Sequence, residues 1–265
     1  MLPVSAGHKK VFLLGGQSNM DGRGATSGLP PALQGSQTDV LLYEDGSLGS
    51  LQPNGAQFGP EITFGRALAD ANPSDSFVLI KYAVGGTDLH GDWDPSGGLE
   101  YNAFASTVTN GLAALADAGH SYEIAGMLWT QGENDARDGE AGAYEANLAN
   151  FIASIRGSYG ADLPFFLSRL SSGQTDLPID QLALVRTAQD NVAAADASAF
   201  LIDTESFSLK NDELHFDSDG QIALGEAFAE AYLNSIPEPS SLALLGIGGV
   251  FLAGRRKNQV AESIL

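Results

Sequence analysis

Cysteine is absent from the 265 residues of this chain. Its absence excludes disulfide cross-links, thiol catalysis, iron–sulfur clusters and cysteine-ligated zinc. Basic residues are also scarce: 13 lysines and arginines stand against 33 aspartates and glutamates, which gives a formal net charge of −20. A surface with this charge repels phosphate backbones, so we expect no nucleic-acid partner. Apolar residues make up 43% of the chain, which is enough for a sizeable folded core.

The sequence has no apolar run of the roughly 20 residues that cross a bilayer comfortably. A shorter run lies at 242–253 and is interrupted only by glycines. It follows Pro-Glu-Pro at 237–239 and precedes Arg-Arg-Lys at 255–257. A basic cluster directly after an apolar stretch is typical of the cytoplasmic end of a membrane segment. A buried core helix is the alternative interpretation.

The order of these three features resembles a PEP-CTERM sorting signal, the C-terminal tail of exported proteins in Gram-negative bacteria that make extracellular polysaccharide. The resemblance implies a short transmembrane helix, transient anchoring in the membrane, and removal of the tail by an exosortase. It also implies a cell-envelope or extracellular destination. Such proteins carry an N-terminal signal peptide, whereas residues 1–8 here lack an apolar region.

Strand-like and helix-like segments alternate along the rest of the chain. We therefore expect an N-terminal tail at 1–9, one folded domain at 10–235 and the sorting tail at 236–265. The alternation predicts an α/β fold, with a mostly parallel sheet covered on both faces by helices. The expected strands lie at 10–14, 40–43, 77–82, 124–129, 163–167 and 200–202, and the expected helices at 61–71, 101–118, 142–159, 179–195 and 219–233.

Four polar segments follow predicted strands or precede the last predicted helix. They are GQSNM at 16–20, VGGT at 84–87, WTQGEND at 129–135 and DELH at 212–215. In a doubly wound sheet the ligand lies outside the carboxyl ends of the strands. All four segments could therefore share one site.

Ser18 follows two glycines at the end of the first predicted strand, where a turn could expose its hydroxyl. A helix N-cap is the alternative role. Asp212 and His215 are three residues apart, a spacing at which a carboxylate can hold one imidazole nitrogen while the other faces a nucleophile. Among the other histidines, His90 is a rival as a base or metal ligand. A surface helix cap is the alternative for Asp212 and His215.

Two neighbouring segments carry groups that could stabilise a developing oxyanion. Gly85 and Gly86 could present a backbone N–H, or could form a plain turn. Gln131 could add a side-chain amide donor. Glu133 has three open roles: assisting His215, holding the Gln131 loop, or simply being solvated.

An acidic stretch at 92–100 resembles the start of a calcium-binding loop. Counting from Asp92, the twelfth position is Ala103 where an EF-hand has glutamate, so the EF-hand pattern fails. Bound calcium there remains an open alternative.

Together, the four segments resemble those of SGNH-type hydrolases of the sialate O-acetylesterase and carbohydrate esterase family 6 group. The resemblance covers residues 10–235 and implies a three-layer α/β/α sandwich with a flavodoxin-like, doubly wound sheet. It further implies Ser18 as nucleophile, His215 as general base and Asp212 as its orienting acid, with Glu133 as a candidate helper acid. The implied oxyanion donors are Ser18, Gly86 and Gln131, and the implied substrate contacts are Gln17, Asn19, Gly85, Thr87 and Trp93.

The implied activity is hydrolysis of O-acetyl esters of carbohydrates, of the acetylated polysaccharide or sialic acid type, through an acetyl-serine intermediate. No metal or cofactor is implied. Members of the group usually have a histidine or similar residue before the Gln-Gly-Glu, where this chain has Thr130, a departure that bears on substrate contacts. A non-catalytic carbohydrate-binding or matrix protein with the same fold is an alternative, as is an esterase acting on lipid or small acyl esters.

Overall fold

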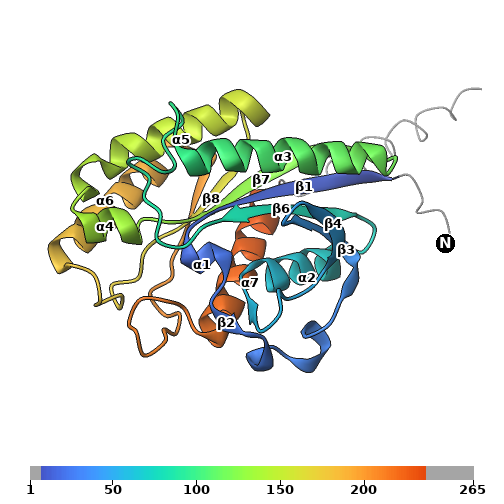
Figure 1. Cartoon of the computed structure of the whole chain (residues 1–265), viewed down its shortest axis with the longest axis horizontal. Coiled ribbons are helices and arrows are strands. Elements are labelled where there is room, and N and C mark those ends of the chain that lie inside the picture. Colours follow the sequence, from blue (N-terminus) through green and yellow to red (C-terminus); the bar gives the residue numbers. More distant parts are fainter. Residues whose placement is uncertain (1–6, 237–265) are drawn as a thin grey trace, which may run out of the picture. The chain divides into compact units, whose positions relative to one another are not determined.

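The computed structural model describes residues 7–236. Within this range a seven-stranded sheet has the strand order β4-β3-β6-β1-β7-β8-β9 (Figure 1). The strands are β1 (His8–Gly16), β3 (Gln37–Glu44), β4 (Ser47–Leu51), β6 (Phe77–Ala83), β7 (Ser121–Thr130), β8 (Phe165–Ser168) and β9 (Ala199–Ile202). All neighbouring strands are parallel except β3 and β4.

Helices cover both faces of this sheet, which confirms the predicted α/β class. The longer helices are α2 (Glu61–Ala71), α3 (Leu99–Asp117), α5 (Tyr144–Tyr159), α6 (Ile179–Ala195) and α7 (Ser218–Ser235). The shorter elements are α1 (Ser18–Asp21), α4 (Glu133–Asp138), β2 (Gly24–Ala25), β5 (Gln57–Phe58) and the 3₁₀ turns Thr26–Gly28, Pro31–Leu33 and Ala141–Ala143. Figure 1 shows α3, α5 and α6 on one face of the sheet and α2 and α7 on the other.

The alternation of side chains along β1 explains how one strand serves two cores. Val11 and Leu13 pack in the cluster shared with α3, α5 and α6. Phe12 and Leu14 pack in the cluster shared with α2 and α7. A strand buried on both faces reads as a continuous apolar run because successive side chains point to opposite faces.

The predicted elements differ from the structure at two places in the sheet. β1 begins at His8, because His8 and Lys9 pair with Ser121 and Tyr122, so the end of the predicted N-terminal tail belongs to the sheet. The β3–β4 hairpin was not expected. It turns at Asp45 and Gly46, both with positive φ (49° and 76°), as two-residue hairpin loops of the Asp-Gly type do.

Apart from the β3–β4 hairpin, the sheet consists of β6, β1, β7, β8 and β9, in that spatial order. Numbered along the chain, these five strands have the order 2-1-3-4-5, which is the flavodoxin-like arrangement. The chain reverses its direction of travel across the sheet at β1. The carboxyl ends of β1, β6 and β7 therefore lie side by side, with Gly16 in register with Ala83 and Thr130. This edge is where an open α/β sheet binds its ligand.

The predicted sorting tail lies outside the described residues, and so does the membrane helix expected within it. Among the helices that the structure describes, none is long and apolar enough to cross a membrane.

Candidate active site

Ser18 is presented by a tight turn at the end of β1. Gly16 has φ 141°, and a Cβ there would lie 2.1 Å from the carbonyl oxygen of Thr130, so only glycine fits between the two strands. Gln17 is the extended N-cap of α1 and Ser18 is the first helical residue. The turn therefore places the Ser18 hydroxyl at the carboxyl edge of the sheet, beside a cavity of about 330 Å³.

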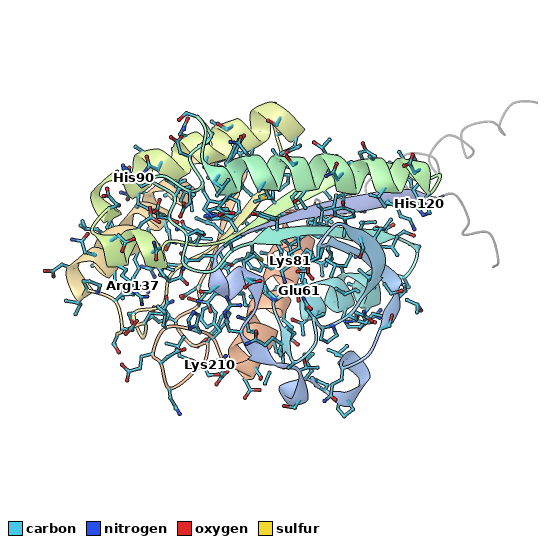
Figure 2. All side chains as sticks on the ribbon, viewed as in Figure 1. Glu61, Lys81, His90, His120, Arg137 and Lys210 are labelled. Carbon is cyan, nitrogen blue, oxygen red and sulfur yellow. The ribbon has the colours of Figure 1, made fainter. Side chains whose placement is uncertain are left out.

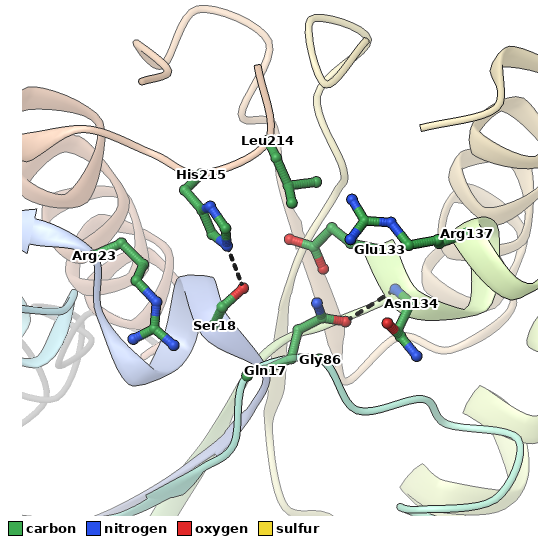
Figure 3. Close-up of a pocket in the computed structure, with 10 residues that line it drawn as sticks. Gln17, Ser18, Arg23, Gly86, Glu133, Asn134, Arg137, Leu214 and His215 are labelled. Carbon is green, nitrogen blue, oxygen red and sulfur yellow. Dashed lines mark hydrogen bonds between the residues drawn. The ribbon is translucent and has the colours of Figure 1, made fainter. Parts of the chain in front are cut away.

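His215 reaches this serine from the loop at 203–217, which connects β9 to α7. Its Nε2 lies 2.9 Å from Ser18 Oγ (Figure 3), and its Nδ1 lies 2.8 Å from Asp212 Oδ2. Asp212 Oδ1 accepts the backbone N–H groups of Leu214 and His215 at 3.0 and 2.9 Å. The same carboxylate therefore shapes the turn and holds the imidazole ring.

These contacts also set the protonation of Asp212. Partial burial would raise its pKa, but the hydrogen bonds from the His215 backbone, the imidazole and the Leu214 N–H outweigh burial, so the pKa lies below its ordinary value. Asp212 is thus ionised at neutral pH and stays so into the acidic range. An ionised carboxylate at Nδ1 fixes the tautomer that leaves Nε2 free to accept the Ser18 proton.

Glu133 is buried at the start of α4 and bonds to other groups than the imidazole. Its Oε1 accepts the side-chain N–H of Asn19 at 2.7 Å and of Gln174 at 3.2 Å. Its Oε2 is buried without a hydrogen-bond partner among the described residues. Burial raises its pKa, although the bonds from Asn19 and Gln174 oppose the rise. The carboxylate in contact with His215 is therefore Asp212.

The cavity contains residues from every predicted polar segment. Its lining residues are Gln17, Ser18, Arg23, Gly85, Gly86, Glu133, Asn134, Arg137, Leu214 and His215 (Figure 3). Gly86 has φ 77°, a conformation that favours glycine. The two arginines bring positive charge to the edge of the cavity, and each is paired with an acid: Arg23 with Asp21, and Arg137 with Asp176.

Gln131 does not line this cavity. Its side chain is fully buried, and its Nε2 donates to Asp135 Oδ2 at 2.5 Å and to the Thr87 carbonyl at 3.1 Å. Asp135 also accepts the backbone N–H groups of Leu89 and His90. Gln131 therefore ties β7 to the loop that carries Gly85 and Gly86. Its predicted role as an oxyanion donor does not fit this placement.

Three predicted substrate contacts, Trp93, Thr87 and Asn19, are also absent from the cavity wall. Trp93 is fully buried, lies edge-on to Trp129 with ring centroids 5.0 Å apart, and donates its indole N–H to Thr87 Oγ1 at 2.9 Å. Asn19 is fully buried between Glu133 and the His215 loop, where its Oδ1 accepts the backbone N–H at position 216 at 3.0 Å. These side chains support the loops around the site from the inside of the core. The other two predicted contacts, Gln17 and Gly85, do line the cavity.

The rival histidine, His90, and the acidic stretch lie elsewhere, and so does His120. His90 is exposed and faces Glu140, while His120 precedes β7, at the opposite edge of the sheet from Ser18 (Figure 2). In the acidic stretch, Asp94 bonds to Ser96 and Glu100 accepts the Tyr82 hydroxyl. In the described part of the chain no group of three or more histidines or acids is arranged to hold a metal ion.

Several residues at the site were not predicted as site residues from the sequence. Arg23, Asn134, Arg137 and Leu214 line the cavity, and Gln174 contacts it through Glu133. Asn134 and Leu214 lie next to predicted residues in the sequence, which is a usable signal. Arg23, Arg137 and Gln174 reach the site only through the fold.

Comparison with known proteins identifies the family of the folded domain and the motif that follows it. Residues 8–234 match the family model described as carbohydrate esterase, sialic acid-specific acetylesterase, and residues 235–257 match the PEP-CTERM protein-sorting motif. A curated protein of Arabidopsis thaliana named as a probable carbohydrate esterase is 27% identical over 263 residues, covering 85% of this chain and 91% of its own.

Solved structures show the same fold. A protein from Arabidopsis thaliana superposes with a TM-score of 0.72 at 24% identity, over 86% of this chain and 99% of the other. A carbohydrate acetylesterase from Xanthomonas citri gives a TM-score of 0.62 at 19% identity, over 84% of this chain and 55% of its own length.

Proposed function

The chain belongs to the sialic acid-specific acetylesterase family of carbohydrate esterases, and on this premise we propose that Ser18, His215 and Asp212 form its catalytic triad. The observation that carries the proposal is the unbroken line of contacts from Ser18 Oγ to His215 at 2.9 Å and from His215 to Asp212 at 2.8 Å. A hydroxyl, an imidazole and a carboxylate in this order constitute an activated nucleophile.

The reaction follows from the roles of these atoms. Ser18 Oγ attacks the acetyl carbonyl carbon while its proton passes to His215 Nε2. The tetrahedral intermediate collapses, the C–O bond to the sugar breaks, and the imidazolium returns its proton to the leaving sugar oxygen. Water then attacks the acetyl-Ser18 ester with His215 again as base, which releases acetate and restores the serine. Asp212 orients the ring and stabilises its positive charge throughout.

Gln17 takes the place of Gln131 as the side-chain donor in the oxyanion hole. Its Oε1 accepts the backbone N–H groups of Gly132 and Asn134 and the side-chain amide of Gln131, each at 3.3 Å, which fixes the orientation of the Gln17 amide. Its Nε2 therefore faces the cavity (Figure 3) and donates to no other side chain or backbone group that the structure describes. The backbone N–H groups of Ser18 and Gly86 complete the hole, where developing negative charge is stabilised.

Replacing the donor at position 17 tests this assignment. Gln17→Glu keeps an oxygen for the two backbone N–H groups and replaces only the cavity-facing NH₂, so we expect kcat to fall by about 10²–10³-fold. Gln131→Met removes the other candidate amide. We expect it to lower Tm, because Asp135 loses a donor, while kcat stays within about tenfold of the wild type. Steady-state kinetics with p-nitrophenyl acetate would refute the assignment if the larger loss of kcat followed the Gln131 substitution.

Acetate release tests the function as a whole. We expect the protein to release acetate from at least one member of a panel of acetylated polysaccharides and O-acetylated sialic acids. Pretreatment with a fluorophosphonate, which reacts with activated serine hydroxyls, should abolish release and add one phosphonyl group to the peptide that carries Ser18. A carbohydrate-binding protein on the same fold would bind members of the panel without releasing acetate. That result, or labelling at another serine, would overturn the proposal.

The C-terminal motif indicates where the proposed esterase is sorted in the cell. A PEP-CTERM motif implies export to the cell envelope through an exosortase. We propose that the tail is cleaved there and that the folded domain acts on acetylated carbohydrate outside the cytoplasm.

A further inference from the structure

Gln174 belongs to the loop at 169–178, between β8 and α6, and its side chain is fully buried behind the catalytic histidine. Its Nε2 donates to the carbonyl oxygen of Leu214 at 2.9 Å and to Glu133 Oε1 at 3.2 Å. Its Oε1 accepts the backbone N–H of Ser171 at 2.9 Å. Since the oxygen is held by its own loop, both amide hydrogens are directed toward the site.

The backbone on both sides of His215 is held by this network. Leu214, on one side, presents its carbonyl to Gln174 at 2.9 Å and to Asn19 Nδ2 at 3.4 Å. Phe216, on the other side, donates its N–H to Asn19 Oδ1. Asn19 is next to Ser18 in α1, so one part of the network is fixed to the nucleophile. We call the hydrogen bonds that Asn19 and Gln174 make to this backbone and to Glu133 the clamp. The clamp joins α1, α4 and two loops, and the distance between Ser18 Oγ and His215 Nε2 thus depends on it.

Two other contacts beside this network lie at exposed positions. Thr175 bonds to Glu213, and Arg137 pairs with Asp176. Exposed contacts of this kind contribute little to a fixed geometry. In contrast, the hydrogen bonds of Gln174 are shielded from water, where a missing donor leaves the Leu214 carbonyl and the Glu133 carboxylate less satisfied.

We propose that Gln174 is a positioning residue for acyl transfer, which holds the His215 loop in line with Ser18 by donating one amide hydrogen to Leu214 and the other to Glu133. This inference rests on the proposed esterase function. It assigns Glu133 a place in the same clamp, as the acceptor that joins Asn19 to Gln174. Glu133 therefore acts through the position of His215 rather than on the ring nitrogen.

Gln174→Met tests the clamp, because methionine has a similar volume and cannot donate a hydrogen bond. A displacement of the base by a fraction of an ångström lowers the rate of the chemical step more than it weakens substrate binding. We therefore expect kcat to fall by about 10–100-fold with KM nearly unchanged. Gln37→Met is the matched control: Gln37 is also buried and donates to the Ile62 carbonyl, but it lies on β3 away from the cavity. We expect Gln37→Met to lower Tm and to leave kcat unchanged.

Gln174→Glu adds a second measurement, the pH dependence of kcat, which would not change if Gln174 only stabilised the fold. The introduced carboxyl would face Glu133 and the Leu214 carbonyl, and His215 and Arg137 line the same cavity as Glu133. Two carboxyls in contact share a proton, so the pair should keep one proton above the ordinary carboxylic range and lose it as pH rises. The introduced carboxyl can donate one hydrogen bond when it is protonated and none when it is ionised. We therefore expect the ratio of variant to wild-type kcat to rise severalfold as pH falls from about 8 to about 6.

The possible outcomes separate this inference from the proposed function. If wild-type protein hydrolyses p-nitrophenyl acetate and Gln174→Met keeps kcat within about twofold of Gln37→Met, the clamp is wrong and the esterase assignment stands. A pH-independent ratio for a folded Gln174→Glu variant would also overturn the clamp. If wild-type protein neither hydrolyses esters nor reacts with a fluorophosphonate at Ser18, the proposed function itself fails, and the clamp fails with it.

Discussion

Asp212→Asn is expected to lower kcat by about 10⁴-fold, the size of the loss when a triad carboxylate becomes an amide without a change in shape. Asparagine can still accept the backbone N–H groups of Leu214 and His215 through its oxygen, so the turn persists. Its NH₂ then faces His215 Nδ1 and donates a hydrogen bond to it, which favours the imidazole tautomer in which Nδ1 carries no hydrogen. Nε2 consequently carries the hydrogen and cannot take the Ser18 proton.

Glu133→Gln is the matched comparison, since it makes the same chemical change at the other candidate acid. The introduced amide can keep an oxygen toward Asn19 and Gln174, and the native carboxylate makes no hydrogen bond to the imidazole. We expect kcat to fall by no more than about tenfold. Steady-state kinetics at neutral pH, with folding checked by circular dichroism, measure both. A severe loss for the glutamine variant alone would identify Glu133 as the acid that supports His215.

The proposed catalytic trio could be predicted from the sequence because it depends on short-range patterns. Ser18 follows β1 directly, and parallel strands with switched order bring β-strand ends together whatever the rest of the chain does. Asp212 and His215 lie within one turn, so their spacing alone allows the carboxylate to reach Nδ1. The overall α/β class follows in the same way from alternating strand and helix patterns.

Side-chain direction was the part that the motifs could not settle. Gln131 directly follows the end of β7, and its side chain is fully buried because it bonds Asp135 and the Thr87 carbonyl behind the site. Trp93 was expected at the substrate but packs against Trp129 and Phe104, where it anchors its loop in the core. A motif reports which residues are near a site, whereas the core decides which of them face it.

Long-range polar contacts were equally beyond the sequence. Gln174 belongs to a loop with no recognisable motif, and its bond to Leu214 joins segments 40 residues apart. Lys81 is a single charge within the otherwise apolar strand β6. In the structure it is nearly fully buried and bonds Glu61 Oε2 at 2.9 Å and Glu44 Oε1 at 3.1 Å (Figure 2). No spacing rule predicts which distant acids will meet such a lysine.

Lys81→Met is expected to lower the free energy of unfolding by about 3–5 kcal/mol, because it leaves two carboxylates in a buried site without their cation. Burial alone would lower the pKa of Lys81, but Glu61 and Glu44 raise it well above its ordinary value, so the ammonium is charged at all accessible pH. Its third bond, at 2.9 Å, goes to the Asp21 carbonyl at the end of α1. The ion cluster therefore supports the helix that carries Ser18.

The pH dependence of this loss distinguishes an uncompensated charge from a packing defect. Burial raises the pKa of Glu44 and Lys81 opposes that rise. Without Lys81 the folded-state pKa of Glu44 should rise further above its unfolded value, so the folded variant binds more protons and its stability falls as pH rises through that interval. The deficit should be smallest near pH 5 and fully developed above neutrality, as measured by urea unfolding at about pH 5 and pH 8.

Lys10→Met is the control: Lys10 forms a half-exposed ion pair with Asp75, and its loss should lower the free energy of unfolding by about 1 kcal/mol or less. A second substitution, Glu61→Gln, should recover part of the Lys81→Met deficit, because it removes one of the stranded charges. Equal losses for the two lysines, or a deficit that does not change with pH, would show that the cluster acts through packing, and that Ser18 owes its position to the tight glycine contacts of the turn alone.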